Sequence, residues 1–292
     1  MSKVTMDLVK ELREKTQISL MECKKALEAS DGNIEQALEF LRKKGASIAV
    51  KRSDSATNNG RIEAFIAPDS KIGAMVEVGC ETDFSANTEA MLNFVTDTAK
   101  AIVQVNPKTI EDLLVVTSSR NDSFKIKDVL DELIAKIGER TLINKFVRFQ
   151  VAANGLVGAY IHPGSTVGVM IELETDNAIS NVEKVKELAK DVCMQIAVMR
   201  PLCVESSQLD PALVEKEREI AREQLKSSGK PAPIIEKIVD GKINKYYEDV
   251  CLENEFFIKN DKLTVKQHVD EVAKQLGLKI KIKQFARYSV KR

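Results

Sequence analysis

Residues 60–77 read GRIEAFIAPDSKIGAMVE, and residues 155–172 read GLVGAYIHPGSTVGVMIE. The two stretches lie 95 residues apart and are identical at eight of their eighteen positions. Each contains two apolar runs rich in β-branched residues, separated by a turn at Pro68-Asp69 or Pro163-Gly164, which is the pattern of a β-hairpin. A hairpin that recurs at a fixed offset indicates that the chain contains an internal duplication.

The sequence that surrounds the two hairpins repeats as well. Each hairpin is followed by a Thr-Asp pair, Thr82-Asp83 or Thr175-Asp176, and then by a helical pattern of about 18 residues that ends near a proline. A third strand-like run, residues 146–152, precedes the second hairpin, and another, residues 280–290, closes the chain. The sequence therefore predicts an α+β fold whose core is a duplicated unit of antiparallel sheet plus helices.

Residues 1–53 are expected to form a separate module of three short amphipathic helices. Ser19 with Glu22, and Asn33 with Gln36, have the spacing of helix N-terminal capping pairs, and Gly45 is expected to end the third helix. The polar run at residues 53–60 reads as a linker. The expected domains are residues 1–53, an N-terminal core subdomain at 54–142, and a C-terminal core subdomain at 143–292. The apolar positions of the three helices are Leu8, Val9, Leu12, Leu20, Cys23, Ala26, Leu27, Ile34, Ala37, Leu38 and Leu41.

The C-terminal subdomain contains a charged insertion at about residues 208–252. Two helical patterns flank the turn sequence Ser227-Ser228-Gly229-Lys230-Pro231, which predicts an antiparallel helical hairpin. Residues 211–249 carry 8 acidic and 8 basic side chains. This balance favours a solvated coiled-coil arm over a nucleic-acid-binding finger.

Composition limits the classes of function. A length of 292 residues fits about two domains. The chain has 44 basic and 44 acidic residues, and no apolar run approaches the roughly 20 residues of a membrane-spanning helix. The first residues do not resemble a secretory or transit peptide, so we expect a cytoplasmic protein that does not bind membranes. The five scattered cysteines read as free, mostly buried thiols.

The sequence contains no signature of a catalytic or cofactor site. It lacks the glycine-rich phosphate loops, the zinc-protease motif and the nucleophile elbow, and it has only two histidines, His162 and His268. Cys80 is expected to be a buried structural thiol. We therefore expect a protein that is not an enzyme and needs neither a metal nor a cofactor.

The segment Glu81-Thr82-Asp83-Phe84-Ser85 stands where a strand ends and a helix begins. An aromatic residue in that place is most often part of the core, and an acidic residue is most often a simple helix cap. The alternative is that Phe84 and Asp83 project together, so that the ring fills a pocket of a partner protein. The sequence alone leaves both readings open.

Several separate motifs, in the right order, resemble the elongation factor Ts family. They are residues 8–13 (LVKELR), residues 21–27 (MECKKAL), Glu81-Thr82-Asp83-Phe84, Lys136-Ile137-Gly138-Glu139, Val167-Gly168-Val169 and Ser228-Gly229-Lys230-Pro231. The resemblance implies a ubiquitin-associated-like N-terminal module, a duplicated core and a coiled-coil insertion. It also implies an exchange factor that binds elongation factor Tu in its GDP-bound and nucleotide-free states and promotes GDP release.

The same resemblance implies roles for particular residues. Thr82, Asp83, Phe84 and Ser85 match the segment that inserts into the GTPase domain of elongation factor Tu and displaces its Mg²⁺ ion. Ser85 stands where the family usually has Val, which predicts weaker or repacked apolar support for the ring. Further partner contacts are implied at Lys24, Ile137, Gly138, His162, Ile258 and Lys259.

Two other functions fit parts of the sequence. The first is a helical adaptor whose three-helix module binds ubiquitin-like or peptide partners while the core only dimerises. Residues 259–292 carry 10 basic and 3 acidic side chains, and Lys279, Lys281 and Lys283 alternate with apolar residues, so the tail could bind RNA. Lysines on an edge strand are the simpler reading, because no aromatic residues alternate with them to stack on bases. Nucleic acid is therefore disfavoured as a partner.

Overall fold

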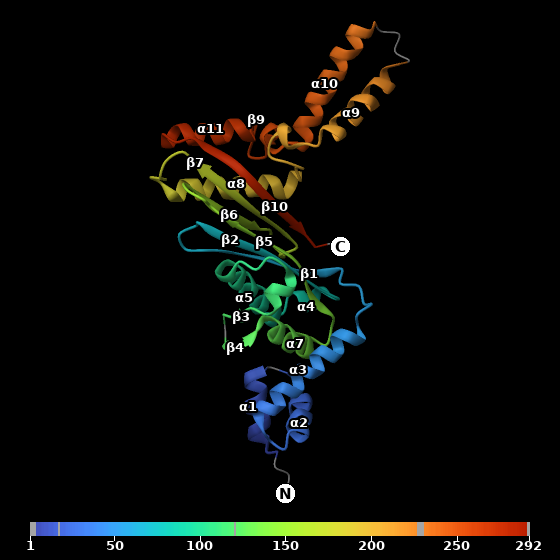
Figure 1. Cartoon of the computed structure of the whole chain (residues 1–292), viewed down its shortest axis with the longest axis vertical. Helices are drawn as coiled ribbons and strands as arrows, with labels where there is room; N and C mark the ends of the chain where they lie inside the picture. The colour runs from blue at the N-terminus through green and yellow to red at the C-terminus, as the bar shows by residue number, and fades with distance from the viewer. Residues whose placement is uncertain (1–3, 17, 120, 227–230, 291–292) are drawn as a thin grey trace.

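The computed structural model describes residues 4–16, 18–119, 121–226 and 231–290. The molecule is elongated, with the N-terminal helices at one end, a helical arm at the other and a layered α/β core between them (Figure 1). Within the described residues, no helix combines the length and apolar character needed to cross a membrane.

Three helices form the N-terminal module: α1 (Met6–Thr16), α2 (Leu20–Ala29) and α3 (Ile34–Lys51). The side chains of Ser19 and Asn33 accept hydrogen bonds from the backbone N–H groups of Glu22 and Gln36, so the N-cap half of each expected capping box is confirmed. The Glu22 carboxylate pairs with Lys25 and Lys44. The helices share a core of their own, which includes Val9, Leu12, Ile18, Cys23, Ala26, Leu27, Ala37 and Leu41.

The expected end of the third helix at Gly45 is wrong, because α3 continues through Gly45 to Lys51. A Cβ atom at Gly45 would lie 1.9 Å from the backbone oxygen of Asp131 in α7 (Ile126–Ile137). This glycine therefore allows α3 to approach α7, and it is not a helix stop. Beside it, the Arg42 guanidinium donates to Glu132 at 2.8 Å, which helps to attach the module to the core.

The first copy contains a three-stranded antiparallel sheet in the order β1-β2-β5. The expected boundary between residues 142 and 143 falls inside β5, which pairs with β2 of the first hairpin. The elements of this copy are β1 (Asn59–Ile66), β2 (Ile72–Cys80), α4 (Asp83–Ala86), α5 (Glu89–Val105), α6 (Ile110–Leu114), β3 (Thr117–Ser118), β4 (Asn121–Lys125), α7 and β5 (Thr141–Gln150).

The second copy repeats this plan, with a sheet in the order β10-β7-β6. Its elements are β6 (Gly155–Ile161), β7 (Val167–Thr175), α8 (Val182–Met199), η1 (Ser206–Gln208), α9 (Pro211–Leu225), α10 (Ala232–Val250), η3 (Leu252–Asn254), β8 (Phe256–Phe257), β9 (Asn260–Thr264), α11 (Val265–Leu276) and β10 (Ile280–Ser289). The duplication is therefore longer than the hairpins, since a short β-ribbon, a helix and a final strand follow in both copies.

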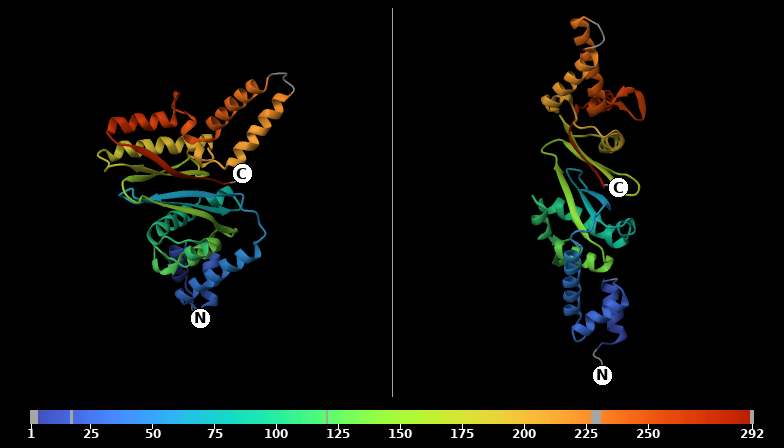
Figure 2. Two further views of the ribbon diagram at one scale, coloured as in Figure 1. Left: turned by 45° about the horizontal axis from the view of Figure 1, so that its top comes forward. Right: turned by 90° about the vertical axis from the view of Figure 1, so that its right-hand side faces the viewer.

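The two sheets face each other between outer layers of helices (Figure 2). Ile62 N–H donates to the Ser165 carbonyl oxygen at 2.8 Å, and the repeat-equivalent Val157 N–H donates to the Ser70 carbonyl oxygen at 2.7 Å. Gly73 and Gly168 are also equivalent, and a Cβ atom on either would come within 2.8 Å of a side chain from the opposite copy. The copies thus pack through a pseudo-twofold interface.

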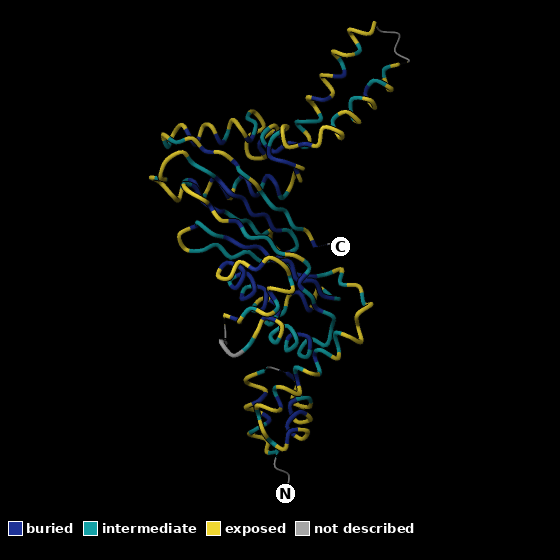
Figure 3. The backbone as a smooth tube through the Cα atoms, viewed as in Figure 1, coloured by how far each residue is buried: buried dark blue, intermediate teal, exposed yellow. Residues whose placement is uncertain are grey.

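The helices α9 and α10 form an arm that projects from the second copy (Figure 1). Their contact buries Ala221, Val239 and Ile243, whereas most of the arm surface is exposed or intermediate (Figure 3). The ion pair between Arg222 and Glu236, at 2.9 Å, joins the two helices. The expected turn at residues 227–230 lies outside the described residues.

Strand β10 lies at the edge of the second sheet, as expected for the lysine-rich tail. Lys281 is exposed, but Lys283 sits at a register shift and pairs with Glu172 and Glu174 at 3.1 and 2.7 Å. The three lysines therefore do not form one continuous face, because the register shift at Lys283 directs its ammonium group to the carboxylates of β7.

Candidate functional site

The candidate site is the corner where β2 ends and the single-turn helix α4 begins. Thr82 is the N-cap residue of α4, and its hydroxyl oxygen accepts from Ser85 N–H at 3.3 Å. Ser85 and Ala86 are each only 5% exposed and face inward, whereas Phe84 is 85% exposed. The turn therefore points Asp83 and Phe84 outward, and the core reading of Phe84 is wrong.

A second motif, 57 residues further along the chain, holds this corner in place. Helix α7 ends at Ile137 with Gly138 as its C-cap, and the next residue, Glu139, reaches the start of α4. One carboxylate oxygen of Glu139 accepts from Thr82 N–H at 3.1 Å, and the other accepts from the Thr82 hydroxyl at 2.8 Å. The structure thus brings Ile137 and Gly138 next to the segment that carries Phe84.

Glu81 connects the corner to the end of the N-terminal module. Its carboxylate accepts from the backbone N–H of Arg140 and from the guanidinium of Arg52, each at 2.7 Å. These hydrogen bonds, that of Arg140 above all, hold the pKa of Glu81 below its ordinary value. Asn59 adds a hydrogen bond from its amide to the Glu81 carbonyl oxygen at 2.8 Å. The backbone that leads to Phe84 is therefore fixed from several sides.

Cys80 is buried beneath the corner. Its thiol donates to the Thr82 carbonyl oxygen at 3.1 Å, and burial raises its pKa to about 12. A thiol with that pKa remains protonated near neutral pH, so it is a poor nucleophile. Cys80 is a structural part of the corner.

Ser85 fills the position where the family usually has Val. It is buried, and its hydroxyl oxygen lies within hydrogen-bond distance of the Thr82 hydroxyl oxygen, at 3.3 Å. At this position serine thus offers a side-chain hydrogen bond that a valine cannot make. The ring of Phe84 itself is absent from the hydrophobic clusters of the core.

Next to Asp83 lies a cavity of about 270 Å³ that both copies line. The second copy contributes Gly164, in the hairpin turn that also carries His162. His162 is exposed, and its Nδ1 lies 3.0 Å from the Tyr160 hydroxyl oxygen. The lining residues are Asn59, Gly60, Asp83, Ala86, Asn87, Gly164, Thr166 and Val290.

The remaining residues implied by the resemblance lie elsewhere along the molecule. Lys24 is exposed on α2 and is 3.8 Å from Glu28. Ile258 and Lys259 lie between β8 and β9 of the second copy, and the Lys259 ammonium pairs with Asp191 at 2.7 Å. Figure 1 places α2 and β9 toward opposite ends of the molecule, with α4 between them.

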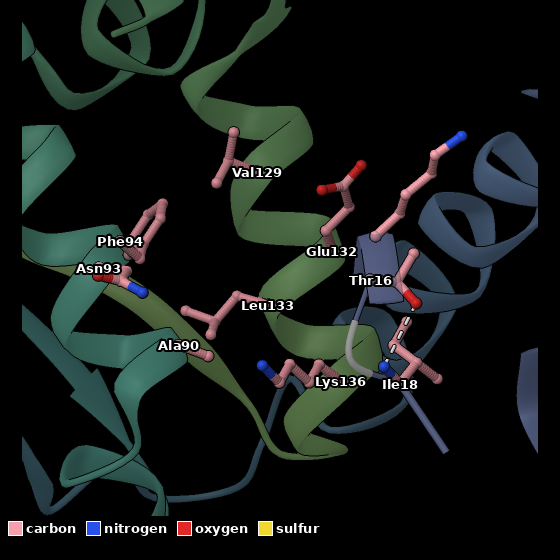
Figure 4. Close-up of a pocket in the computed structure, with 10 residues that line it drawn as sticks. Thr16, Ile18, Ala90, Asn93, Phe94, Val129, Glu132, Leu133 and Lys136 are labelled. Atoms are coloured by element: carbon pink, nitrogen blue, oxygen red, sulfur yellow. Dashed lines mark hydrogen bonds between the residues drawn. The ribbon is translucent and has the colours of Figure 1, made fainter. Parts of the chain in front are cut away.

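A second cavity, of about 190 Å³, lies between the N-terminal module and helices α5 and α7 (Figure 4). The carboxylate of Glu132, one of its lining groups, already accepts from Arg42. Burial lowers the pKa of Lys136, another lining residue. The cavity belongs to the joint between module and core. Its lining residues are Lys15, Thr16, Ile18, Ala90, Asn93, Phe94, Val129, Glu132, Leu133 and Lys136.

Among the residues that the structure describes, no group of three or more His, Cys, Asp or Glu side chains is arranged to hold a metal ion. The distinctive feature of the corner is an aromatic ring displayed on a rigid support. Clusters of buried aromatic anchors commonly carry the binding energy of protein interfaces. The corner therefore has the form of a candidate protein-binding surface: an exposed ring on a preformed support.

Comparison with known proteins identifies the family. The family model described as elongation factor TS matches residues 81–292. Proteins named elongation factor Ts are similar over nearly the whole chain. The relative from Clostridium botulinum (strain Eklund 17B / Type B) is 41% identical, covering 96% of this chain and 90% of its own. The relative from Chlorobaculum parvum is 38% identical, covering 99% of both chains. The chain belongs to the elongation factor Ts family.

Proposed function

We propose that this chain is a guanine-nucleotide exchange factor that binds GDP-bound elongation factor Tu and promotes GDP release. The observation that carries the proposal is the 85% exposure of Phe84 on a corner held by Glu139. Family membership supplies the partner, and the corner supplies a rigid projection that can enter it. The proposed role requires no catalytic residue, no cofactor and no direct contact with the nucleotide.

Thermodynamic linkage explains how binding alone can release GDP. A protein that binds the nucleotide-free GTPase more tightly than the GDP-bound form must weaken GDP binding by the same factor. GTP can then occupy the emptied site, after which the exchange factor dissociates. The chain thus acts by binding the nucleotide-free state of the partner more tightly than the GDP-bound state.

The proposed wedge is Asp83 together with Phe84, supported by Thr82 and Ser85. Entry of the ring into the GTPase domain would shift the groups that hold Mg²⁺, and loss of this ion would remove a large positive charge beside the phosphates. Asp83 would bring a carboxylate into the same region. The direction of the effect is faster GDP release.

We further propose that the contact surface is extended. Lys24 would contact the partner from the N-terminal module, Ile137 and Gly138 from beside the wedge, and His162 from the second hairpin. Ile258 and Lys259 would add a contact from the second copy. The cavity beside Asp83 supports this arrangement, since it places the second hairpin next to the wedge.

The proposal includes the architecture implied by the family. We infer that helices α1–α3 form a ubiquitin-associated-like module and that α9 and α10 form a coiled coil. The proposed domains are residues 1–53, 54–142 and 143–292, with β5 crossing the second boundary because it completes the sheet of the first copy. The proposed location is the cytoplasm. The separate core of the three helices supports the first of these divisions.

The experiment is stopped-flow release of fluorescent GDP from elongation factor Tu, with the full-length chain and its Phe84→Ala variant. Burying a phenylalanine ring contributes roughly 1.5–3 kcal/mol, so the variant should accelerate release about 10- to 100-fold less than the original chain. Val50, 74% exposed on α3, provides a control, and Val50→Ala should leave the rate unchanged.

Stability measurements separate binding from folding. Because Phe84 lies outside the core, Phe84→Ala should alter the free energy of unfolding by less than about 0.5 kcal/mol. An unchanged rate of GDP release in a folded Phe84→Ala protein would rule out the wedge. Failure of the original chain to accelerate release would rule out the exchange function itself.

A further inference from the structure

Two of the five cysteines lie against each other at the base of the arm. The Sγ atoms of Cys203 and Cys251 are 3.6 Å apart, and the two residues form an isolated parallel β-bridge. Both are free thiols. They belong to a small apolar cluster with Leu209 that packs against the first part of the arm.

The backbone on both sides of this pair is held by hydrogen bonds. Leu252 N–H donates to the Cys203 carbonyl oxygen at 3.0 Å, and Leu202 N–H donates to the Val250 carbonyl oxygen at 2.8 Å. A disulfide requires Cα atoms roughly 4.4–6.8 Å apart and side chains that point toward each other. Bridged residues whose sulfur atoms already touch need only small side-chain rotations to bond.

The other three cysteines contact oxygen atoms. The thiols of Cys23, Cys80 and Cys193 donate to the carbonyl oxygens of Ile18, Thr82 and Gly158, respectively. Among the described residues, the Cys203–Cys251 contact is thus the place where two thiols are ready to combine.

The position of the pair gives its oxidation a structural consequence. Cys203 precedes α9, and Cys251 directly follows α10, so the pair brackets both helices of the arm. A covalent bond between them would close the chain at the point where the arm leaves the core. It would restrict rotation of the arm about its two connections.

We propose that Cys203 and Cys251 form a redox modification site, at which a peroxide converts the two thiols into a disulfide that fixes the base of the arm. Cys203 is 9% exposed and Cys251 is fully buried, so the peroxide meets Cys203 first.

The reaction has two steps. The Cys203 thiolate attacks one oxygen of the peroxide and becomes a sulfenic acid, while the other oxygen leaves as hydroxide. The Cys251 thiolate then displaces hydroxide from the Cys203 sulfur. The two released hydroxides take up the two thiol protons. In total, two thiols and one hydrogen peroxide give one disulfide and two waters, and the peroxide receives the two electrons that the sulfurs lose.

The environment sets the speed of this reaction. Burial raises the pKa of Cys203, and it raises the pKa of Cys251 to about 12. Little thiolate is present at pH 7, so oxidation is slow there. Below the pKa of the attacking thiol, the rate should rise about tenfold for each pH unit.

The test uses the full-length reduced chain, treated with hydrogen peroxide at pH 7 and pH 8, quenched with an alkylating reagent in denaturant so that the buried thiols react, and digested for mass spectrometry. We expect a peptide pair linked through Cys203 and Cys251, formed faster at pH 8 and lost on treatment with dithiothreitol. Cys23, Cys80 and Cys193 serve as internal controls and should remain alkylated. In Cys251→Ser, Cys203 should instead accumulate as a sulfenic acid that dimedone traps.

Hydrogen exchange of the same oxidised and reduced samples tests the structural consequence. Amides in residues 202–210 and 250–254 should exchange at least about threefold more slowly after oxidation. If Cys203 and Cys251 stay separately alkylated, or link to other cysteines, the modification site is refuted. If the disulfide forms and exchange at these amides is unchanged, its role at the base of the arm is refuted.

Discussion

Replacing Glu139 by Gln tests whether the corner that displays Phe84 is held as the structure indicates. Both carboxylate oxygens of Glu139 accept hydrogen bonds from Thr82, one from its backbone N–H and one from its hydroxyl. A glutamine has the same shape but only one acceptor oxygen. Its NH₂ group can pair with Thr82 only if the Thr82 hydroxyl rotates to accept instead of donating, and in either case both hydrogen bonds lose their charged acceptor.

The size of the effect follows from these contacts. A hydrogen bond to a charged group contributes about 1.5–3 kcal/mol, and partial solvent access at Thr82 and Glu139 favours the lower end. We expect the free energy of unfolding to fall by about 1.5 kcal/mol in Glu139→Gln. If the corner must be rigid for the wedge to act, acceleration of GDP release should fall up to about tenfold.

Urea denaturation and stopped-flow GDP release measure the two effects, and a double-mutant cycle with Thr82→Ala assigns them to the contact. Thr82→Ala removes the hydroxyl and keeps the backbone N–H. The losses in the double variant should therefore be smaller than the sum of the single losses by at least about 0.5 kcal/mol. Strictly additive losses would refute the proposed role of the Glu139–Thr82 contact.

Three further predictions concern stability. Gly45→Ala should lower the free energy of unfolding by about 2 kcal/mol or more in urea denaturation, because its Cβ would overlap Asp131 of α7; an unchanged midpoint would contradict the close approach. Burial raises the pKa of Glu255 from 4.5 to about 7, so the folded chain binds this proton more tightly, and the resulting stabilisation is lost as pH rises through 7. Between pH 5 and pH 8 the free energy of unfolding of the original chain should fall by up to about 3 kcal/mol because of Glu255, and Glu255→Gln should remove this fall. Parallel pH profiles of thermal unfolding for the two proteins would contradict the raised pKa of Glu255. Gly73→Ala and Gly168→Ala should each lower the free energy of unfolding by about 1–3 kcal/mol, since both added Cβ atoms enter the interface between the copies. A large difference between the two variants in urea denaturation would contradict the pseudo-twofold packing.

The hairpins were predictable from the sequence because their repeat is strong and each hairpin is local. The later parts of the duplication were not. Strands β3 and β8 have only 2 residues each, too few for an alternating pattern to be recognised. Gly45 misled the helix prediction because a glycine at a helix end and one at a helix contact look alike in sequence. Only the position of Asp131, 86 residues away, distinguishes them.

The candidate site was predictable in its composition but not in its geometry. The exposure of Phe84 depends on Ser85 and Ala86 taking the inward face of α4, which a single turn does not reveal by periodicity. Glu139 belonged to a motif noticed in the sequence, yet no local signal paired it with Thr82. The contact arises because the end of α7 and the end of β2 meet in three dimensions.

The hydrogen bonds that cross between the copies have a mechanical consequence. A side chain that forces its way into another protein experiences an equal opposing force, and a soft support would yield before the target did. Strand β1 lies against α4 and is tied to the second hairpin through the Ile62–Ser165 hydrogen bond. If Phe84 enters a partner as proposed, the load on it would be shared by the second sheet, and the duplicated half would serve as a stiff foundation for a projection that only the first half carries.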